Sequence, residues 1–247
     1  MDRFALLYSA AVIELNRLAR SYSGREAVRG LTLSVPGGEV FGLLGPNGAG
    51  KSTTLKMLAT LLKPSGGSAS IGGHDLVADA DAVRRIIGYV PEGAELYETL
   101  SGEEFLDLVR DLHRLDPAAA EPLRRRLAEA FELSGELNRA IGEYSKGMKQ
   151  KLLLIAALQH DPKVLLLDEP LDGLDVSAQE VLKAVLRQRA AAGCAVVYSS
   201  HILEVVEKVC DRVGIMHRGE LALLVAPREI ASGETLSQLF LRITAAP

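Results

Sequence analysis

One glycine-rich segment restricts the possible folds of this chain more than any other feature. Residues 45–52 read Gly-Pro-Asn-Gly-Ala-Gly-Lys-Ser and match the pattern G-x-x-x-x-G-K-[ST] at every fixed position. An apolar run at 40–44 predicts a buried strand before the loop, and leucines at helical spacing predict a helix after it that ends at Pro64. Unpaired N–H groups at the start of a helix attract anions. A chance match is the alternative, but the flanking strand and helix favour a site for nucleotide phosphates.

Each part of this loop has an expected contact. The glycines allow the backbone to bend so that several N–H groups point at phosphate oxygens. Lys51 is expected to reach the β- and γ-phosphates, and the hydroxyl of Ser52 is expected to be a Mg²⁺ ligand. GTPases, kinases and helicases share the pattern, so it does not define the reaction. The nucleotide-binding residues predicted here are Gly45, Pro46, Asn47, Gly48, Ala49, Gly50, Lys51, Ser52 and Thr53.

A pair of carboxylates ends a second apolar run. Val164 to Leu167 are followed directly by Asp168 and Glu169. In an open α/β sheet ligands bind at the carboxyl edge of the strands, where a central strand would place both acids. Asp168 is expected to hold Mg²⁺, and Glu169 is expected to orient and deprotonate the attacking water. A surface turn that caps a helix is the alternative, but the phosphate loop favours the catalytic interpretation.

The order of the predicted elements indicates an α/β fold. Short strands are expected between Val12 and Val35, where apolar and polar residues alternate. From about 100 to 160 charge-rich helices replace the strands, and after 164 a strand, a helix and a strand form a βαβ unit with parallel strands. The run Arg124-Arg125-Arg126 is expected to be a solvated helix face rather than an anion site. Residues 236–243 are expected to form a helix packed on its own domain, or else on a partner.

Composition narrows the class of protein further. The 247 residues are 48% hydrophobic, enough for a sizeable core, and 28 Lys and Arg nearly balance 32 Asp and Glu. This balance argues against a nucleic-acid or anionic-membrane binder and favours a protein partner. Cys194 and Cys210 are expected to be buried thiols rather than a disulfide. The apolar stretch Phe4 to Ile13 is too short to span a bilayer, so a soluble chain that reaches a membrane through a partner is expected.

A polar segment at 144–150 carries a resemblance to a known family. Tyr144-Ser145-Lys146-Gly147-Met148-Lys149-Gln150 resembles the L-S-G-G-Q signature of ABC transporter ATPases, with departures at Tyr144, Lys146 and Met148. By itself the segment would be the N-cap of an ordinary helix. Ser145 lies 94 residues after Lys51 and 23 before Asp168, separations similar to those of the family. The resemblance covers essentially all of residues 12–245.

The resemblance implies roles for further residues. Tyr22 corresponds to the aromatic residue that stacks on adenine, although an ordinary tyrosine at a strand end is the alternative. His201 matches the switch histidine that contacts the γ-phosphate, and Asp175, in the run Gly173-Leu174-Asp175, lies in the loop that communicates across the dimer. Glu92 stands where the family has the glutamine of its Q-loop. A carboxylate there would approach Mg²⁺ or its water, and it would add negative charge beside the phosphates.

The fold implied by the resemblance is that of a P-loop NTPase of the ABC ATPase type. A mainly parallel core sheet is expected, with an N-terminal antiparallel β subdomain and an inserted α-helical subdomain. The domain would cover 12–245, after an N-terminal extension at 1–11. Its parts would be the β subdomain and P-loop core (12–95), the helical subdomain with the signature (96–160), the core with the carboxylates and the switch histidine (161–220) and a C-terminal helix (221–245).

The implied function is that of an ATP-binding and ATP-hydrolysing transporter subunit, similar to those that pair with separate permeases of the ABC-2 type. ATP and Mg²⁺ are the implied ligands. Two copies, or this chain and a similar ATPase, would pack head to tail, so that Ser145 and Gly147 of one copy contact the γ-phosphate held by Lys51 of the other. Closure of this dimer would drive transport, with a lean toward export, from the cytoplasmic face of the membrane.

Two rival functions remain open from the sequence alone. A cytosolic ABC ATPase that remodels translation or DNA has no permease, but such proteins commonly carry two fused ATPase domains or long coiled-coil insertions. A kinase or GTPase needs an acceptor site or a guanine-specific loop, and the sequence presents neither. Co-purification with a hydrophobic membrane protein separates the transporter subunit from the first rival.

Overall fold

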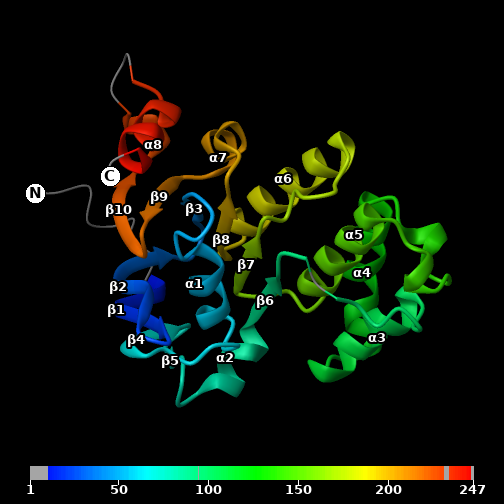
Figure 1. The fold of residues 1–247 in the computed structure, drawn as a ribbon. Helices are drawn as coiled ribbons and strands as arrows, with labels where there is room; N and C mark the ends of the chain where they lie inside the picture. The colour runs from blue at the N-terminus through cyan, green and yellow to red at the C-terminus, as the bar shows by residue number, and fades with distance from the viewer. Residues whose placement is uncertain (1–10, 94, 231–233, 246–247) are drawn as a thin grey trace, which may run out of the picture.

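A six-stranded sheet forms the centre of the computed structural model, which describes residues 11–93, 95–230 and 234–245 (Figure 1). The strand order is β10-β9-β3-β8-β7-β6, and all neighbours are parallel except β9 and β10. The middle strands are buried along their whole length, as a parallel sheet covered on both faces requires. The strands are β3 (Val40–Leu44), β6 (Ile87–Val90), β7 (Val164–Asp168), β8 (Ala195–Ser200), β9 (Arg212–His217) and β10 (Glu220–Val225).

A second sheet contains four antiparallel strands in the order β2-β1-β4-β5. The expectation of short strands between Val12 and Val35 is wrong, because β1 and β2 are each 12 residues long. Their pairing shifts register several times, once between Leu15 and Leu18, and such irregularities interrupt the alternation from which strand length is predicted. The strands are β1 (Ala11–Tyr22), β2 (Arg25–Pro36), β4 (Gly66–Ile71) and β5 (His74–Asp75).

Helices fill the segment between β6 and β7 and gather on the right of Figure 1, away from β1 and β2. The first of them, α3, begins at a capping box in which Ser101 and Glu104 exchange hydrogen bonds between side chain and backbone. The elements are α3 (Gly102–Leu112), α4 (Pro117–Ala130), the 3-10 turns η1 (Ser134–Glu136) and η2 (Ile141–Glu143), and α5 (Lys146–Leu158). The sheets and this helical part together confirm the predicted fold class.

The helix after the glycine-rich loop is shorter than predicted. α1 spans Lys51–Leu58 and does not continue to Pro64, because Ala59 caps it and Thr60 takes a left-handed conformation with φ 60°. Leu62, outside the helix, still packs against the core. The remaining helical elements are α2 (Ala80–Ile86), α6 (Val176–Ala191), α7 (Leu203–Val209), the 3-10 turn η3 (Pro227–Glu229) and α8 (Leu236–Thr244).

Two hydrophobic clusters lie on opposite faces of the central sheet. Alternate residues of one strand enter different clusters, because successive side chains of a strand point to opposite faces. In β7, Leu165 and Leu167 join the cluster that contains α5, α6 and α8, whereas Leu166 joins the cluster of α1 and the antiparallel sheet. Packing on both faces therefore fixes the strands whose ends carry the candidate site.

Within the arginine run at 124–126, Arg124 departs from the prediction of a solvated face, whereas Arg125 and Arg126 are exposed as predicted. Arg124 is buried and lies close to the carboxylates of Glu103, Asp107 and Glu121, so it ties α3 to α4. Arg125 is exposed and pairs with Glu121. A buried guanidinium needs such partners, because an unpaired charge in the interior is strongly unfavourable.

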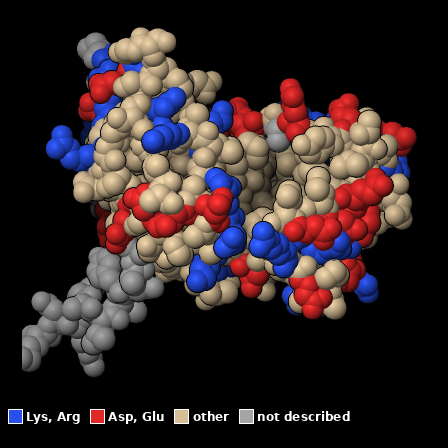
Figure 2. All heavy atoms as spheres, turned by 90° about the horizontal axis from the view of Figure 1, so that it is seen from below, with Lys and Arg blue, Asp and Glu red and all other residues tan. Residues whose placement is uncertain are grey.

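The two cysteines are free and buried, as predicted. Across the described ranges, the structure contains no helix with both the length and the apolar character needed to cross a bilayer. Residues 1–10 of the expected extension, with most of the stretch Phe4 to Ile13, lie outside the described residues. On the face seen in Figure 2, basic and acidic side chains are interspersed, in line with the near balance of charge.

Candidate active site

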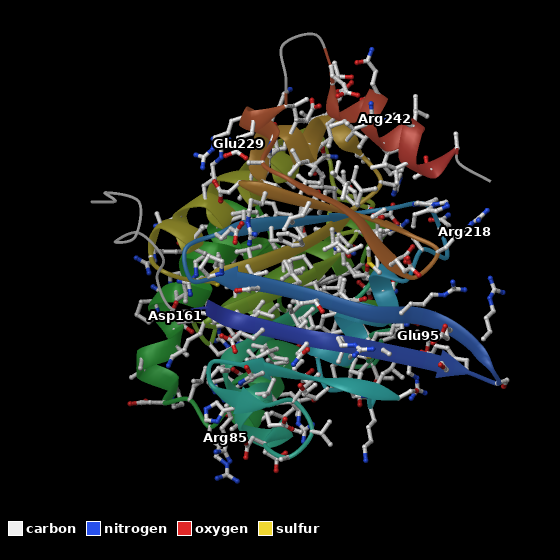
Figure 3. The ribbon with its side chains drawn as sticks, turned by 90° about the vertical axis from the view of Figure 1, so that its left-hand side faces the viewer. Arg85, Glu95, Asp161, Arg218, Glu229 and Arg242 are labelled. Carbon is white, nitrogen blue, oxygen red and sulfur yellow. The ribbon has the colours of Figure 1, made fainter. Side chains whose placement is uncertain are left out.

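The carboxyl ends of the parallel strands meet at one edge of the molecule. In Figure 3, Arg218, which follows β9, and Glu95, which follows β6, lie at the same edge, whereas Asp161, which precedes β7, lies at the opposite edge. A cavity of about 1240 Å³ opens at the edge where the strands end. Five predicted features line it, namely Tyr22, the loop 45–53, Glu92, Glu169 and His201. The structure thus brings together residues that are up to 179 positions apart (from Tyr22 to His201) in the sequence.

The glycine-rich loop is held tightly against its neighbours. Cβ atoms added at Gly45 and Gly50 would lie 2.5 Å and 2.6 Å from the backbone oxygens of Met216 and Ala27, so side chains there have no space. Gly50 precedes α1 with φ 107°, a conformation that favours glycine. The ammonium of Lys51 is buried and donates to the carbonyl oxygen of Gly45 at 2.7 Å. The loop therefore presents a cation and a helix start to the same cavity.

Asp168 is almost fully buried at the end of β7 and is held by a serine that sequence reasoning missed. The Ser199 hydroxyl donates to Asp168 Oδ1 at 2.6 Å and accepts from the backbone N–H of Glu169 at 3.1 Å. Parallel pairing of β7 with β8 puts Asp168 opposite Ser199. Ser199 thereby fixes both acids, and the only sequence signal for it was its place at the end of a predicted strand.

The residues present fit a Mg²⁺ ion bound together with phosphates. Asp168 Oδ2 is buried and has no hydrogen-bond partner among the described residues, which leaves a carboxylate oxygen free for a cation or its water. The described residues contain no cluster of three or more His, Cys, Asp or Glu that could hold a metal by themselves. Mg²⁺ commonly binds through one or two protein oxygens, substrate phosphates and water, so one carboxylate and the Ser52 hydroxyl are an adequate donor set.

Glu169 and His201 form a contact inside the cavity. His201 Nδ1 lies 3.0 Å from Glu169 Oε1, and the glutamate is mostly buried while the histidine is 65% exposed. Glu169 also has φ 49°, an uncommon conformation for a residue with a side chain. Such conformations concentrate at functional sites because the surrounding structure must hold them in place. The pair can accept a proton from a water molecule and hand it on.

Tyr22 stands at the entrance of the cavity with one face of its ring covered. The guanidinium of Arg20 lies 4.6 Å from the ring centroid, a cation–π arrangement, and donates to the carbonyl oxygen of Lys63. The tyrosine is 43% exposed, so part of the ring is open to a flat ligand. Arg20 was not predicted, and the sequence gives no signal for it beyond its two-residue spacing from Tyr22.

A sequence model of the ABC transporter family matches residues 28–172, more than half of the chain. The chain belongs to the ABC transporter family. The daunorubicin/doxorubicin resistance ATP-binding protein DrrA of Streptomyces peucetius is 37% identical over 94% of this chain and 70% of its own length. This agreement confirms the family predicted from the glycine-rich loop and the signature.

Solved structures of ABC proteins share the fold. A structure described as the ATP-binding subunit of an ABC transporter superposes with a TM-score of 0.90 at 33% identity, over 94% of this chain and 99% of its own. The ATP-binding cassette MJ0796, solved as a dimer in a post-hydrolysis state with ADP and Pi, gives 0.77 at 24% identity, over 87% and 98%. The chain is therefore an ATPase of the ABC type in both sequence and fold.

The ABC signature lies apart from the cavity that holds the glycine-rich loop. Ser145 caps α5 by accepting from the N–H of Met148, as predicted for an N-cap, and neither Ser145 nor Gly147 lines the large cavity. A Cβ at Gly147 would meet the Gly173 oxygen at 2.7 Å, so this position approaches the loop before α6 closely. Asp175 caps α6 and pairs with Lys151 at 3.1 Å. In this copy the signature segment and the glycine-rich loop therefore line different cavities.

Glu92 occupies the Q-loop position and faces two cavities. It lines the large cavity, and it also lines a smaller one of about 300 Å³ beside the signature. Its side chain is exposed and makes no ion pair or side-chain hydrogen bond with the residues that the structure describes. The carboxylate is therefore not held by another described side chain, and its approach to Mg²⁺ or its water stays a prediction.

Several residues of the cavity wall were missed by sequence reasoning. His217 ends β9, Arg218 lies in the turn between β9 and β10, and Phe240 comes from α8. The first two belong to no motif, and the apolar spacing of α8 indicated a helix packed on its own domain or on a partner. Their place follows from topology, because β9 pairs with β3 and so ends beside the glycine-rich loop.

Proposed function

We propose that this chain drives transport, in the direction of export, through a separate membrane permease of the ABC-2 type by ATP-dependent dimerisation. The observation that carries the proposal is the division of the site: one cavity holds Tyr22, the glycine-rich loop, Glu169 and His201, while Ser145 and Gly147 lie outside it. A second copy packed head to tail places its own signature against this cavity, where the signature of the first copy does not reach. The dimeric state named for the cassette MJ0796 supports this arrangement.

In the proposed reaction each side chain has one task. Tyr22 stacks on adenine, and the N–H groups of the loop 45–53 with Lys51 bind the phosphates. Mg²⁺, when held near Ser52 and Asp168, would neutralise charge on the β- and γ-phosphates. Glu169 accepts a proton from a water molecule. At the same time the oxygen of that water bonds to the γ-phosphorus, and the bond between the γ-phosphorus and the bridging β–γ oxygen breaks. His201 orients Glu169 and contacts the γ-phosphate.

The second copy contributes binding energy that depends on the γ-phosphate. Ser145 and the N–H groups at the start of α5 contact this phosphate from across the interface, since a helix start favours an anion. Loss of the γ-phosphate removes these contacts and opens the dimer. Asp175, close to the signature through Lys151, relays the opening between the two sites. Whether the second copy is identical or a similar ATPase does not change this chemistry.

The family and the relative's name support the proposed partner and location. A protein named for resistance to two drugs fits a transporter that removes them from the cell. This chain is proposed to sit on the cytoplasmic face of the membrane, peripherally, with its Glu92 loop and helical segment against the permease. A role in translation or DNA remodelling finds no support in the charge balance of the chain.

Affinity purification of the tagged chain from detergent-solubilised membranes tests this function. A polytopic membrane protein is expected to co-purify in fixed ratio, and reconstitution with it into vesicles should couple ATP hydrolysis to solute movement. Recovery with ribosomes or nucleic acid, and none with membranes, would support the rival function instead. A Lys51→Ala variant should keep the membrane partner and lose hydrolysis, which separates docking from catalysis.

A further inference from the structure

Lys146 is a departure from the family's signature, and its side chain lies on the surface beside the loop that precedes α6. It is the first residue of α5, directly after the cap Ser145, and its side chain is 70% exposed. The stem lies across Gly173, where an added Cβ would meet Lys146 Cγ at 3.1 Å and Cδ at 3.2 Å. The ammonium donates to Asp172 at 2.6 Å. Lys146 is thus folded back onto the loop that precedes α6 in its own copy.

The contact with Asp172 is of a kind that exchanges easily. Asp172 is itself 57% exposed, and the Lys146 ammonium makes no other hydrogen bond or ion pair with the described residues. Exposed ion pairs contribute little, because solvent screens them and two long side chains lose freedom to form them. A stronger anion brought near the start of α5 would therefore compete for the ammonium.

Charge around the signature favours such an exchange. Lys146 lines the smaller cavity together with three carboxylates, those of Glu92, Glu169 and Asp172. The other lysine there, Lys149, is paired with Glu98 at 2.6 Å. Glu92 adds a negative charge where the family has a neutral glutamine. A triphosphate brought against this surface by a second copy would add more negative charge, and the Lys146 ammonium is a cation placed to offset it.

We propose that Lys146 is a further nucleotide-contacting residue, held by Asp172 in the free copy and transferred to the γ-phosphate bound by Lys51 of a second copy when the two close. The inference rests on the proposed dimerisation and deepens it. Ser145 and the backbone at the start of α5 then act with a full positive charge beside them. A charge-assisted contact of this kind is stronger than one between neutral groups.

The test measures ATP-dependent dimerisation in the Glu169→Gln background by analytical ultracentrifugation with Mg-ATP or Mg-ADP. Lys146→Met should raise the dimer dissociation constant by about tenfold or more, as loss of a contact to a charged group predicts. Lys146→Arg should restore most of the affinity. Asp172→Asn should leave the dimer as tight or tighter, because it releases the ammonium. ATP affinity of the single copy should stay unchanged in all three variants.

A matched control and two contrary outcomes make the inference decidable. Lys149→Met removes a neighbouring lysine with an equally short ion pair, and its dimer constant should change less than about twofold. If Lys146→Met and Asp172→Asn weakened the dimer equally, the ion pair would serve only to stabilise its own copy, and the inference would be wrong. An unchanged dimer dissociation constant in Lys146→Met would also overturn it. If the Glu169→Gln parent itself stays monomeric with ATP, the proposed function fails, and this inference fails with it.

Discussion

The end of β7 and the start of α5 carry the two halves of the proposed site, and they are built in opposite ways. Asp168 is 1% exposed and is fixed by Ser199, inside a sheet that is packed on both faces. Lys146 is 70% exposed and is held by one surface ion pair. Groups that must keep one geometry are thus held by burial. Groups proposed to change partners are held by contacts that solvent already weakens.

Glu169→Gln tests the buried half of the site, and we expect it to have the largest effect of the variants, a loss of ATP turnover. The variant keeps the shape of the side chain but cannot accept a proton, so turnover should fall by about 10²–10⁴-fold. ATP binding should remain, and the dimer should accumulate because the γ-phosphate is retained. Single-turnover hydrolysis and equilibrium nucleotide binding give the two readouts. Normal hydrolysis by this variant would show that another group is the base.

A stacked pair of histidines links the far end of the helical segment to the core and makes stability depend on pH. The ring centroids of His113 and His160 lie 3.8 Å apart, and His160 Nε2 lies 2.9 Å from the Ile87 oxygen. Burial, with smaller contributions from the charges of His113 and Arg189, lowers the pKa of His160 to about 4. The unfolded chain therefore takes up this proton at a higher pH than the folded one.

Stability from His160 should be complete above pH 6.5 and should be lost as the pH falls toward 4. The gap between 6.5 and about 4 corresponds to about 3 kcal/mol. Urea unfolding at pH 7 and pH 4.5 should show a larger loss in the wild type than in His160→Gln, which cannot titrate. An equal loss in both proteins would mean that titration of His160 does not contribute to the pH dependence of stability.

Ser199→Ala should weaken the buried half without removing a reacting group. It deletes the donor to Asp168 and the acceptor for the Glu169 N–H, so the unfolding free energy should fall by about 2 kcal/mol. The hydrolysis rate should fall together with Mg²⁺ affinity in the presence of ATP, since Asp168 loses its fixed position. Ser200→Ala, next along the chain, is the matched control. A change in stability with unaltered Mg²⁺ dependence would limit Ser199 to a structural role.

Tyr22→Ala changes the exposed part of the cavity and should have the smallest effect of these variants, a modest loss of ATP affinity. Loss of stacking should weaken ATP binding by about tenfold, or about 1.4 kcal/mol. Arg20→Met should weaken it less, because the guanidinium only supports the far face of the ring. Fluorescent-nucleotide titration of both variants measures this difference. Unchanged affinity in Tyr22→Ala would favour an ordinary tyrosine at a strand end.

The parts of the fold that were predictable are those decided by local chemistry. The bounds of β3 and β7 follow from apolar runs that end at a glycine or at paired acids, and the loop 45–52 follows from its motif. The premature end of α1 was not predictable, because the left-handed position after the helix is occupied by Thr60 and not by a glycine that would have marked it in the sequence. Leucine spacing continued past the true end of the helix.

What escaped prediction depends on distant partners. Arg124 looked solvated because its carboxylate partners are up to 21 residues away and meet it only after α3 and α4 pack. Ser199 gained its role through the pairing of β8 with β7, and His217 through the pairing of β9 with β3. Spacing and motif alone contain no information on such contacts. Lys51 and Glu169 from their motifs, and His201 from the family resemblance, do line one cavity.

The concentration dependence of ATP hydrolysis tests the central claim most directly, since a site completed by a second copy works only in the dimer. Specific activity of the purified chain should rise with protein concentration at saturating Mg-ATP and level off where sedimentation shows complete dimerisation. A specific activity that stays constant down to concentrations at which the chain is monomeric would contradict the account, because one copy would then hold a complete active site.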